Sequence, residues 1–517
     1  MLSKILSYGL QGIEGFLVEI EEDITAGLPH FDIVGLADTA VKESKERVRS
    51  AIKNSGLEYP TKRYTVNLAP ADVKKEGPLY DLGIAIGILV ATGQIKNNKY
   101  KDFIIIGELS LNGEIKKVKG VLPLLISARE KGYTNFIIPK ENESEAKFIS
   151  GIKCYSFSNL NDVCAFLKDE IQQEEIKICN FDEIKYEEKN FLDFEFVKGQ
   201  YSAKRALEIA AAGGHNILLI GPPGSGKSML AKCFAGILPE LTFEEALEIT
   251  KIHSISGELD YKKGIVFSRP FRTPHHSASA VSLTGGGVHS KPGEISLAHN
   301  GVLYLDEFPE YSRQVIEMLR QPMEDGCITV ARANATITYP SSFTLIASMN
   351  PCPCGNYGSK DRECKCSASQ IHKYLAKLSG PIMDRIDMHI EVDNISYADL
   401  NSDRKEEKSK DIKNRVDKAR NIQLKRFENS KTFCNAKMSV MESKKFCKLS
   451  KDCQLLMEQA FDTLKLSARA NDRILKVART IADLDGEEEI LPRHIAEAIS
   501  YRTLDRKYWS VWWKEKY

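Results

Sequence analysis

The chain has 517 residues, of which 42% are hydrophobic, so it is long enough for two or three globular domains with their own cores. Its net charge is only +1, from 72 Lys+Arg and 71 Asp+Glu, and it has no run of eighteen apolar residues, so we expect no membrane-spanning helix. Residues 401–517 are locally basic, with 27 Lys+Arg against 19 Asp+Glu. Such a region either faces nucleic-acid phosphates or is a solvated helical surface, and charge alone leaves both readings open.

The N-terminus and the cysteines indicate the compartment. The first residues, MLSKILSYGLQGIEGFLVEIEED, become acidic early and contain no small-residue cleavage site, so we expect no signal peptide. Twelve cysteines in such a chain favour a reducing, cytoplasmic environment, where structural disulfides are rare. Cysteines that cluster in that environment more often hold a metal.

Residues 1–168 are predicted to form an α+β domain, because helix-like segments separate the strand-like runs FLVEI, FDIVGL, YTVNLA, DFIIIGEL and NFIIP. The run EGPLYDLGIAIGILVATG and the later GELSLNGEIKKVKGVLPLLISAREKG resemble the proteolytic domain of Lon, which has the ribosomal S5 domain 2-like fold. That resemblance puts Leu79 and Leu122 where active members carry a serine and a lysine. A leucine can neither attack a carbonyl nor take a proton, so we expect a non-catalytic domain for ring assembly and substrate contact.

The rest of the chain divides by pattern. Residues 169–196 are acidic and lack a long periodic apolar face, which predicts a linker. Residues 197–395 alternate helix and strand signals, as is typical of an α/β domain. Residues 396–517 show helical apolar spacing and many charges, which predicts a small helical domain.

The most specific motif is NILLIGPPGSGKSMLAKCFAGIL, in which an apolar strand (217–220) runs into a glycine-rich turn and then a helical pattern. Backbone N–H groups of such a turn and the helix N-terminus bind the phosphates of ATP. Lys227 is expected to pair with the β and γ phosphates, and the Ser228 hydroxyl to coordinate Mg²⁺. The predicted phosphate-binding residues are Gly221, Pro222, Pro223, Gly224, Ser225, Gly226, Lys227 and Ser228.

Two later strand-like runs end in polar residues that suit ATP hydrolysis. GVLYLDEF ends in Asp306, expected to hold the Mg²⁺ shell, and Glu307, expected to orient and deprotonate the attacking water. SFTLIASMN ends in Asn350, which we expect to position water near the γ-phosphate.

Four cysteines follow that strand within fifteen residues: Cys352, Cys354, Cys364 and Cys366. Four thiolates on two short turns can close a tetrahedral Zn²⁺ site and stabilise a loop (352–366) that has no core. The C-x-C spacing is tighter than the usual C-x-x-C, so redox-active or free thiols remain the alternative.

Several motifs together resemble the YifB/ComM family of magnesium-chelatase-like AAA+ ATPases. They are PFRTPHHSASAVSLTGGG, KPGEISLAHNGVLYLDEF, LRQPMEDG, SMNPCPCG, GPIMDRIDMHI and SARANDRILKVARTIADL. The resemblance implies an AAA+ P-loop domain with a C-terminal helical lid. It also implies that Gly199 and Gln200 flank the adenine, that Arg385 is an arginine finger acting on a neighbour's ATP, and that Arg469 is the second sensor arginine. An arginine supplied in trans requires a ring, so a homo-oligomer, most simply a hexamer, is expected.

Two inserts are candidates for DNA contact. TPHHSASAVSLTGGG, with His275 and His276, is expected to be a mobile loop that related motors project toward the ring pore. CITVARANATITYP is expected to be a hairpin, in which Arg332 could meet backbone phosphate. In both cases the alternative is a plain loop that supports the fold.

The sequence therefore predicts a cytoplasmic, ring-forming ATPase without a membrane segment, which requires ATP, Mg²⁺ and a structural Zn²⁺. The family resemblance favours helicase or branch-migration work on single-stranded or branched DNA, in recombination or natural transformation, with possible recombination-protein partners. The alternatives are an AAA+ remodeller of protein substrates and a chelatase-type motor subunit. Trp509, Trp512 and Trp513 in the tail are expected to share a helix face, which more often serves packing than base stacking.

Overall fold

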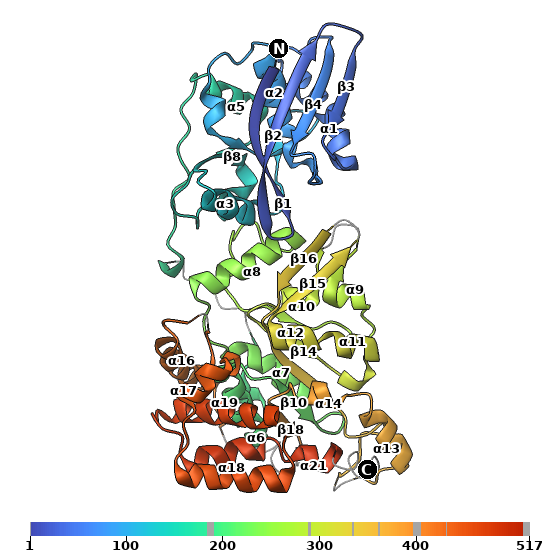
Figure 1. Cartoon of the computed structure of the whole chain (residues 1–517), viewed down its shortest axis with the longest axis vertical. Helices are drawn as coiled ribbons and strands as arrows, with labels where there is room; N and C mark the ends of the chain where they lie inside the picture. Colours follow the sequence, from blue (N-terminus) through green and yellow to red (C-terminus); the bar gives the residue numbers. More distant parts are fainter. Residues whose placement is uncertain are drawn as a thin grey trace. The chain divides into compact units, whose positions relative to one another are not determined.

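The computed structural model describes residues 2–183, 191–287, 291–332, 335–359, 362–395, 405–430 and 432–509 (Figure 1). The chain forms two compact units, Met1–Tyr186 with Phe243–Phe267, and Glu187–Thr242 with Ser268–Tyr517. Across the described ranges, no helix combines the length and apolar character needed to cross a membrane.

The first unit is built on a seven-stranded sheet in the order β3-β4-β2-β1-β5-β8-β9. Its first two strands form a long antiparallel hairpin in which Gln11 pairs with Glu14. The turn between them uses Gly12 at φ +64°, a conformation that glycine adopts without strain. The strands are β1 (Leu2–Gln11), β2 (Glu14–Thr25), β3 (His30–Val34), β4 (Arg63–Ala69), β5 (Ile104–Ile105), β8 (Asn135–Pro139) and β9 (Lys153–Phe157), with a separate pair β6 (Glu108–Leu109) and β7 (Ile115–Lys116).

Helices cover this sheet on both faces. Alternate residues of the inner strands point to opposite sides, so Ile105 and Ile137 join one apolar core while Ile104 and Phe136 join another. The first core also contains α1 (Thr39–Asn54), α2 (Asp81–Ala91) and α5 (Leu160–Leu167), and the second contains α3 (Val121–Glu130) and α4 (Glu143–Ala146). The predicted α+β N-terminal domain is thus confirmed.

Helix α8 (Phe243–Ser256) belongs to this first unit, whereas the sequence pattern predicts it in the ATPase domain at 197–395. It packs against α3, with Leu247 on the second core. The buried Ser254 hydroxyl donates to Glu145 at 2.9 Å and accepts from the backbone N–H of Gly120 at 3.2 Å. Burial and hydrogen bonding, rather than chain order, therefore decide where this segment folds.

Several described residues of segment 169–196, which the sequence predicts to be a linker, pack against or hydrogen-bond to other parts of the chain. Ile176 donates its backbone N–H to Cys154 at 2.9 Å, and Phe181 packs its ring on Phe267 with centroids 5.3 Å apart, both within the first unit. Phe194, at the other end, is completely buried in the core of the second unit. Residues 184–190 lie outside the described part of the chain.

The second unit contains a five-stranded parallel sheet in the order β11-β14-β17-β10-β18. Three of its strands, with sequences ILLI, VLYL and TLIASM, are almost fully buried, as expected for a parallel sheet covered by helices. The strands are β10 (Ile217–Ile220), β11 (Phe271–Arg272), β14 (Val302–Leu305), β17 (Thr344–Met349) and β18 (Met388–Glu391).

Helices and two small hairpins complete the core of this unit. The hairpins are β12 (Gly285–Gly286) with β13 (Lys291–Pro292), and β15 (Cys327–Arg332) with β16 (Ala335–Pro340). The helices are α6 (Tyr201–Gly213), α7 (Lys227–Phe234), α9 (Ala280–Thr284), α10 (Glu294–Leu297), α11 (Arg313–Met318), α12 (Arg320–Asp325), α13 (Ala368–Leu375) and α14 (Gly380–Met383).

The C-terminal region is helical, as predicted. Its helices are α16 (Ser409–Arg426), α17 (Val440–Phe446), α18 (Lys451–Leu464), α19 (Ala468–Asp485), α20 (Pro492–Ser500) and α21 (Leu504–Trp509). A buried ion pair ties this lid to the sheet, because Arg473 on α19 donates to Asp387 at 2.8 Å and the backbone N–H of Asn216 donates to the same carboxylate at 2.7 Å. Trp509 ends α21 beside His389, and Trp512 and Trp513 lie outside the described residues.

Candidate nucleotide and metal sites

The glycine-rich turn 221–226 connects the interior strand β10 to the N-terminus of α7, as predicted. Gly224 and Gly226 have φ of +83° and +89°, and a Cβ on Gly221 would lie 2.2 Å from the carbonyl oxygen of Val392. These positions therefore require glycine for backbone conformation and close packing. The result is a turn that presents backbone N–H groups at a helix N-terminus, which is an anion-binding arrangement.

A cleft of about 370 Å³ opens in front of this turn. Predicted residues from three strand ends meet in it: the phosphate-loop residues Pro223, Gly224, Gly226, Lys227 and Ser228, together with Asp306, Glu307 and Asn350. The strand order explains why, since β14 and β17 neighbour one another and β17 neighbours β10, so their carboxyl ends lie at one edge of the sheet.

Lys227 is only 9% exposed and points along the turn. Its Nζ donates to the carbonyl oxygens of Gly221 and Pro222, both at 2.8 Å, and to Asn350 Oδ1 at 3.3 Å. Burial lowers the pKa of Lys227 to about 8, although the nearby carboxylates of Asp306 and Glu307 oppose that shift. The ammonium group is therefore held in place by weak neutral acceptors that an anionic ligand can replace.

Asp306 is fixed from several sides. The Ser228 hydroxyl donates to its Oδ2 at 2.9 Å, and the Ser348 hydroxyl donates to its Oδ1. Burial alone would raise the pKa of Asp306, but hydrogen bonds from Ser348, Ser228, Tyr304 and the Glu307 backbone outweigh it and hold the pKa below its usual value. An ionised carboxylate beside a serine hydroxyl suits Mg²⁺, which prefers oxygen ligands.

Ser348 was not among the predicted site residues. It lies two residues before Asn350 on β17, and Leu305 of β14 pairs with Ala347 in the sheet register. Because side chains alternate along a strand, that register brings Ser348 beside Asp306. The sequence alone does not indicate the contact between Ser348 and Asp306, because that contact depends on how β14 and β17 pair.

Glu307 lies at the edge of the cleft with φ of +52° and a half-exposed side chain. Its Oε2 is 3.6 Å from Nδ1 of His276, which also packs edge-on against Tyr311 with centroids 6.5 Å apart. The Tyr311 hydroxyl donates to the Pro274 carbonyl at 2.6 Å, so it anchors the start of the PHH segment. His276, which the sequence predicts on a loop toward the ring pore, lies in this structure beside Glu307, the residue expected to act as the base.

The remaining part of that insert is only partly irregular. It was expected to be a mobile loop, whereas residues 280–284 form α9 and Gly285–Gly286 pair with Lys291–Pro292. The His275 ring packs on that of His276 in a tilted arrangement, with centroids 4.1 Å apart, and His275 forms a hydrogen bond with Ser277 at 2.7 Å. Residues 288–290 lie outside the described residues. A role of His275 and His276 in DNA contact stays a prediction.

The predicted hairpin at 327–340 is confirmed as the antiparallel pair β15 and β16. Arg332 ends β15, at the turn whose residues 333–334 are outside the described part of the chain. Its contact with DNA stays a prediction.

The two residues expected near the adenine lie beside the phosphate loop. Gln200 Nε2 donates to the carbonyl oxygens of Asp393 at 2.6 Å and Ser225 at 3.4 Å. The backbone N–H of Gly199 donates to Glu406 at 3.0 Å. Gln200 has φ of +56° at the start of α6, so the chain turns sharply at this point next to the loop.

Arg385 and Arg469 meet away from the cleft. Both guanidinium groups bind the Glu324 carboxylate, Arg385 through Oε2 and Arg469 through Oε1 at 3.4 Å. Neither arginine is among the described residues that line the phosphate cleft of its own chain. The Arg385 side chain is 8% exposed and that of Arg469 58%, so Glu324 at the end of α12 holds one buried and one exposed cation.

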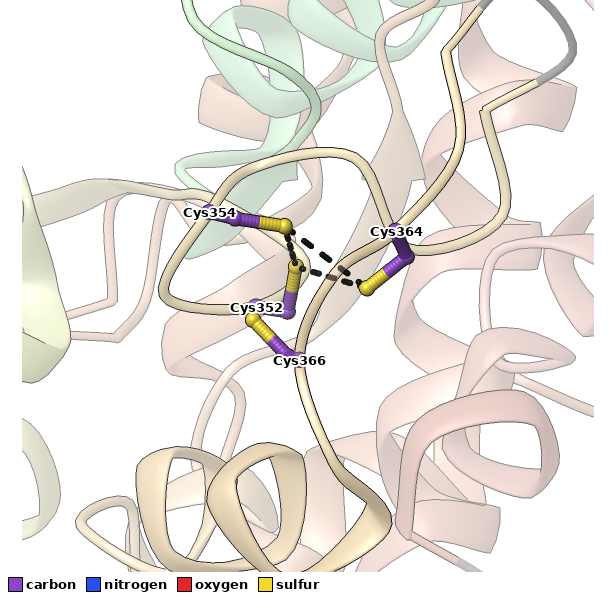
Figure 2. Close-up of side chains that lie close together, drawn as sticks. All are labelled: Cys352, Cys354, Cys364 and Cys366. Carbon is purple, nitrogen blue, oxygen red and sulfur yellow. Dashed lines mark hydrogen bonds between the residues drawn. The ribbon is translucent and has the colours of Figure 1, made fainter.

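The four predicted cysteines come together, as Figure 2 shows. The sulfurs of Cys352, Cys354 and Cys364 are 3.4 to 3.7 Å apart, and all four lie within 4.8 Å of one another. Sulfurs bound to one tetrahedral Zn²⁺ at about 2.3 Å are about 3.8 Å apart, whereas a disulfide needs about 2.05 Å. The donor set therefore fits Zn²⁺, and Cys352, Cys354, Cys364 and Cys366 are the residues that would hold it.

The electrostatics of the cysteine loop agree with a metal-binding role. Hydrogen bonds from the backbone N–H groups of Asn356 and Lys365 lower the pKa of Cys354 to about 6, so a thiolate forms readily there. Burial raises the pKa of Cys352. A cation is the partner that allows further thiolates to form side by side.

The two leucines that the Lon resemblance singled out lie in the apolar interior of the first unit. Leu122 is completely buried in its second apolar core, and Leu79 packs against the same core. The absence of proteolytic chemistry from this unit stays a prediction.

Family models agree with this picture over most of the chain. Residues 193–400 match the model described as magnesium chelatase, subunit ChlI, residues 20–142 match subunit ChlI of Mg-chelatase, and residues 406–502 match its ChlI C-terminal region.

Individual relatives extend over the full length. The chain is 45% identical to the competence protein ComM of Haemophilus influenzae over 512 residues, which covers 98% of each chain. It is 44% identical to the uncharacterized protein YifB of Escherichia coli over 507 residues, again 98% of each. The magnesium-chelatase subunit ChlI of Mesostigma viride is 21% identical over 348 residues, 61% of this chain and 87% of that protein.

Proposed function

Because the chain belongs to the YifB/ComM family of magnesium-chelatase-like AAA+ ATPases, we propose that it is a ring-forming motor that uses ATP hydrolysis to act on DNA. The observation that carries the ATPase part is the cleft that Lys227, Ser228, Asp306, Glu307 and Asn350 line together. It brings together a phosphate cradle, a cation site, a base and a polar sensor.

Binding follows from the chain's own groups. The β and γ phosphates of ATP replace the neutral carbonyl acceptors of the Lys227 ammonium, and the N–H groups of the turn bind the remaining oxygens. The Ser228 hydroxyl and the Asp306 carboxylate would hold Mg²⁺, which neutralises charge on the phosphates when it is bound.

Hydrolysis uses Glu307 and Asn350. A water oxygen attacks the γ-phosphorus, Glu307 accepts the water proton, and the bond to the β–γ bridging oxygen breaks to leave ADP and phosphate. Asn350 is close enough to Lys227, at 3.3 Å, to orient that water beside the γ-phosphate. His276, at 3.6 Å from Glu307, positions the carboxylate before the substrate is in place.

The arginine geometry supports a ring. Arg385 and Arg469 share Glu324, and neither is among the described residues that line the cleft of their own chain. A neighbouring subunit's γ-phosphate, which carries more negative charge than Glu324, would compete for the Arg385 guanidinium when subunits meet, and Arg469 keeps the role of second sensor arginine that the family resemblance implies. A hexamer is the ring size that we propose from family resemblance.

DNA as the substrate is supported by three features. The full-length similarity to a protein named for competence is the strongest. The β15–β16 hairpin carries Arg332 in its sequence, and residues 401–517 carry a net positive charge, which suits a phosphate backbone. The proposed task is branch migration or unwinding in the cytoplasm, during recombination or uptake of transforming DNA, and the partners that we propose are recombination proteins.

A chelatase-type motor is the second candidate, because all three matching family models describe a magnesium-chelatase subunit. Such a motor would couple ATP hydrolysis to metal insertion into a porphyrin. It predicts no response of the ATPase to DNA.

ATPase rates measured with and without single-stranded, forked and four-way-junction DNA separate these candidates. We expect stimulation by at least one DNA and displacement of its strands by the wild type but not by Lys227→Ala. An ATPase that hydrolyses at the same rate with every DNA and displaces none would contradict the DNA assignment while leaving the ATPase intact.

We also propose a structural Zn²⁺ at the four cysteines, supported by their sulfur spacing. Metal analysis of the purified protein should give about one zinc per chain. A chain without bound metal, and with Cys352→Ser and Cys366→Ser as stable as wild type, would favour free thiols.

A further inference from the structure

The cysteine loop touches the phosphate-binding loop directly. Gly355, next to Cys354, has φ of +80°, and a Cβ built on it would lie 2.4 Å from Cδ and 2.9 Å from Cγ of Pro223. Contact as close as this leaves no room for any side chain at residue 355. The second proline of the phosphate loop is thus seated on the backbone of the cysteine loop.

A second connection runs through the strand that precedes the cysteines. Met349, the last residue of β17, accepts the backbone N–H of Gly221 at 3.1 Å, and Asn350 accepts from Lys227 at 3.3 Å. Cys352 is fully buried only two residues later. The beginning of the cysteine loop is therefore tied to both ends of the phosphate loop, 221 and 227.

Within the cysteine loop, local bonds transmit the position of the sulfurs to Gly355. The backbone N–H of Gly355 donates to the Cys352 carbonyl at 3.0 Å, and the backbone N–H of Tyr357 donates to Cys352 Sγ at 3.3 Å. The Tyr357 ring packs edge-on against Tyr508 of α21, with centroids 6.2 Å apart. A loop pinned by its sulfurs and by this ring contact cannot move away from Pro223 without breaking them.

We propose that the metal-closed cysteine loop braces the phosphate-binding loop through Gly355 and Pro223, so that metal retention and nucleotide affinity are coupled. This proposal rests on the zinc and nucleotide sites proposed above and adds a dependence between them. If the metal stabilises the nucleotide-binding form of the loop, nucleotide must stabilise the metal by the same factor, because linkage between two binding equilibria is reciprocal.

The first test removes the metal. In the full chain, Cys366→Ser is compared with Cys179→Ser, a half-buried cysteine outside the cluster. Zinc content and the affinity for a fluorescent ADP analogue are measured for both. We expect Cys366→Ser to lose zinc and to bind nucleotide between about five and about 150 times more weakly, the usual range of coupling between sites. Unchanged affinity in the zinc-free variant would overturn the coupling.

The reverse effect, that of nucleotide on zinc binding, is measured with the wild-type protein. Wild-type protein is titrated to equilibrium with a chromogenic chelator of known zinc affinity, and the zinc dissociation constant is measured with and without saturating MgADP. Tighter zinc binding with nucleotide is expected, by the same factor as in the first test. Equal zinc dissociation constants would contradict the proposal, whereas a protein that holds no zinc or binds no nucleotide would instead overturn the proposed sites themselves.

The second test addresses the contact. Gly355→Ala inserts a methyl group against the Pro223 ring and should weaken nucleotide binding while zinc content stays at the wild-type level. Pro223→Ala removes the Cγ and Cδ atoms that the methyl group would meet, so in that background Gly355→Ala should have much less effect. The same loss in both backgrounds would show backbone strain at residue 355 and not the contact, and would contradict the brace.

Discussion

The pKa of Lys227 leads to a quantitative prediction about nucleotide binding. Burial lowers that pKa to about 8 in the free protein, and phosphate oxygens raise it again when ATP is bound. The protonated form binds, so affinity is full below pH 8 and falls as the free protein loses the proton above it. Binding should therefore take up protons near pH 8 and release none there.

The size of the effect follows from that pKa. About one tenth of free Lys227 is deprotonated at pH 7 and about ten elevenths at pH 9, so the dissociation constant for MgADP should rise roughly tenfold between these values. Each pH unit beyond 8 is worth about 1.4 kcal/mol until the pKa of the bound state is reached.

Fluorescence titration of a labelled ADP at constant Mg²⁺ between pH 7 and pH 9 measures this rise. Lys227→Arg keeps its charge throughout the range and should bind with a flat pH profile. Lys232→Met, which changes an exposed lysine on the same helix, should keep the wild-type profile. A flat wild-type curve, or the same curve in Lys227→Met, would refute the reasoning.

Three further changes have defined outcomes. Ser348→Ala removes the hydroxyl that holds the Asp306 carboxylate in place, so the Mg²⁺ concentration for half-maximal ATPase should rise roughly tenfold, which corresponds to about 1.5 kcal/mol for a hydrogen bond to a charged group; an unchanged Mg²⁺ dependence would exclude that role. Glu307→Gln should slow single-turnover hydrolysis by about 10² to 10⁴ while nucleotide affinity is kept, and loss of binding instead would place Glu307 in the binding step. Glu22 is 1% exposed and neither of its carboxylate oxygens has a partner among the described residues, so burial raises its pKa well above the usual value. Deprotonation of the buried Glu22 carboxyl destabilises the fold, and this destabilisation is absent below the ordinary carboxyl pKa and grows as the pH rises toward the pKa of Glu22 in the folded protein. Glu22→Met should therefore stabilise the first unit by about 1–3 kcal/mol at pH 7 and by less at pH 4. A difference in melting temperature that does not shrink on acidification would contradict this.

The nucleotide site was predictable because each of its parts is short and local. The strand ILLI is apolar and continuous, the turn that follows needs glycine, and the acidic pair follows a second apolar run, so spacing and residue type were sufficient. The four cysteines were predictable for the same reason, since a loop of fifteen residues brings them together without help from the rest of the fold.

Features that depend on tertiary pairing were missed. Strand β1 is central to its sheet, yet its sequence LSKILSYGLQ buries Ser3 and Ser7 and so lacks a clear apolar alternation. The fold of α8 into the first unit depends on partners more than one hundred residues away, such as Glu145 and Gly120. His276 reached Glu307 by the same kind of long-range placement, which residue spacing does not encode.

The domain boundaries depend partly on local sequence pattern and partly on tertiary contacts. The predicted boundaries at 168 and 396 were drawn from changes in pattern, which are local, and they remain predictions about domains. The two compact units differ from them at 243–267, where an inserted segment leaves one unit and folds with the other. Composition could not reveal where that segment folds, because apolar residues in a sequence do not specify which of two cores they join.

The central claim, that one subunit's arginine completes a neighbour's ATP site, is tested most directly by mixing two inactive variants. Lys227→Ala keeps its arginines but cannot hold ATP, whereas Arg385→Ala keeps its phosphate loop but lacks the finger. In a ring, an Arg385→Ala site beside a Lys227→Ala subunit has every group that it needs. We predict that ATP hydrolysis returns on mixing, with the largest rate when both variants are abundant. Activity that stays at the level of the separate variants, in mixtures shown by sizing to contain both chains in one assembly, would contradict the claim.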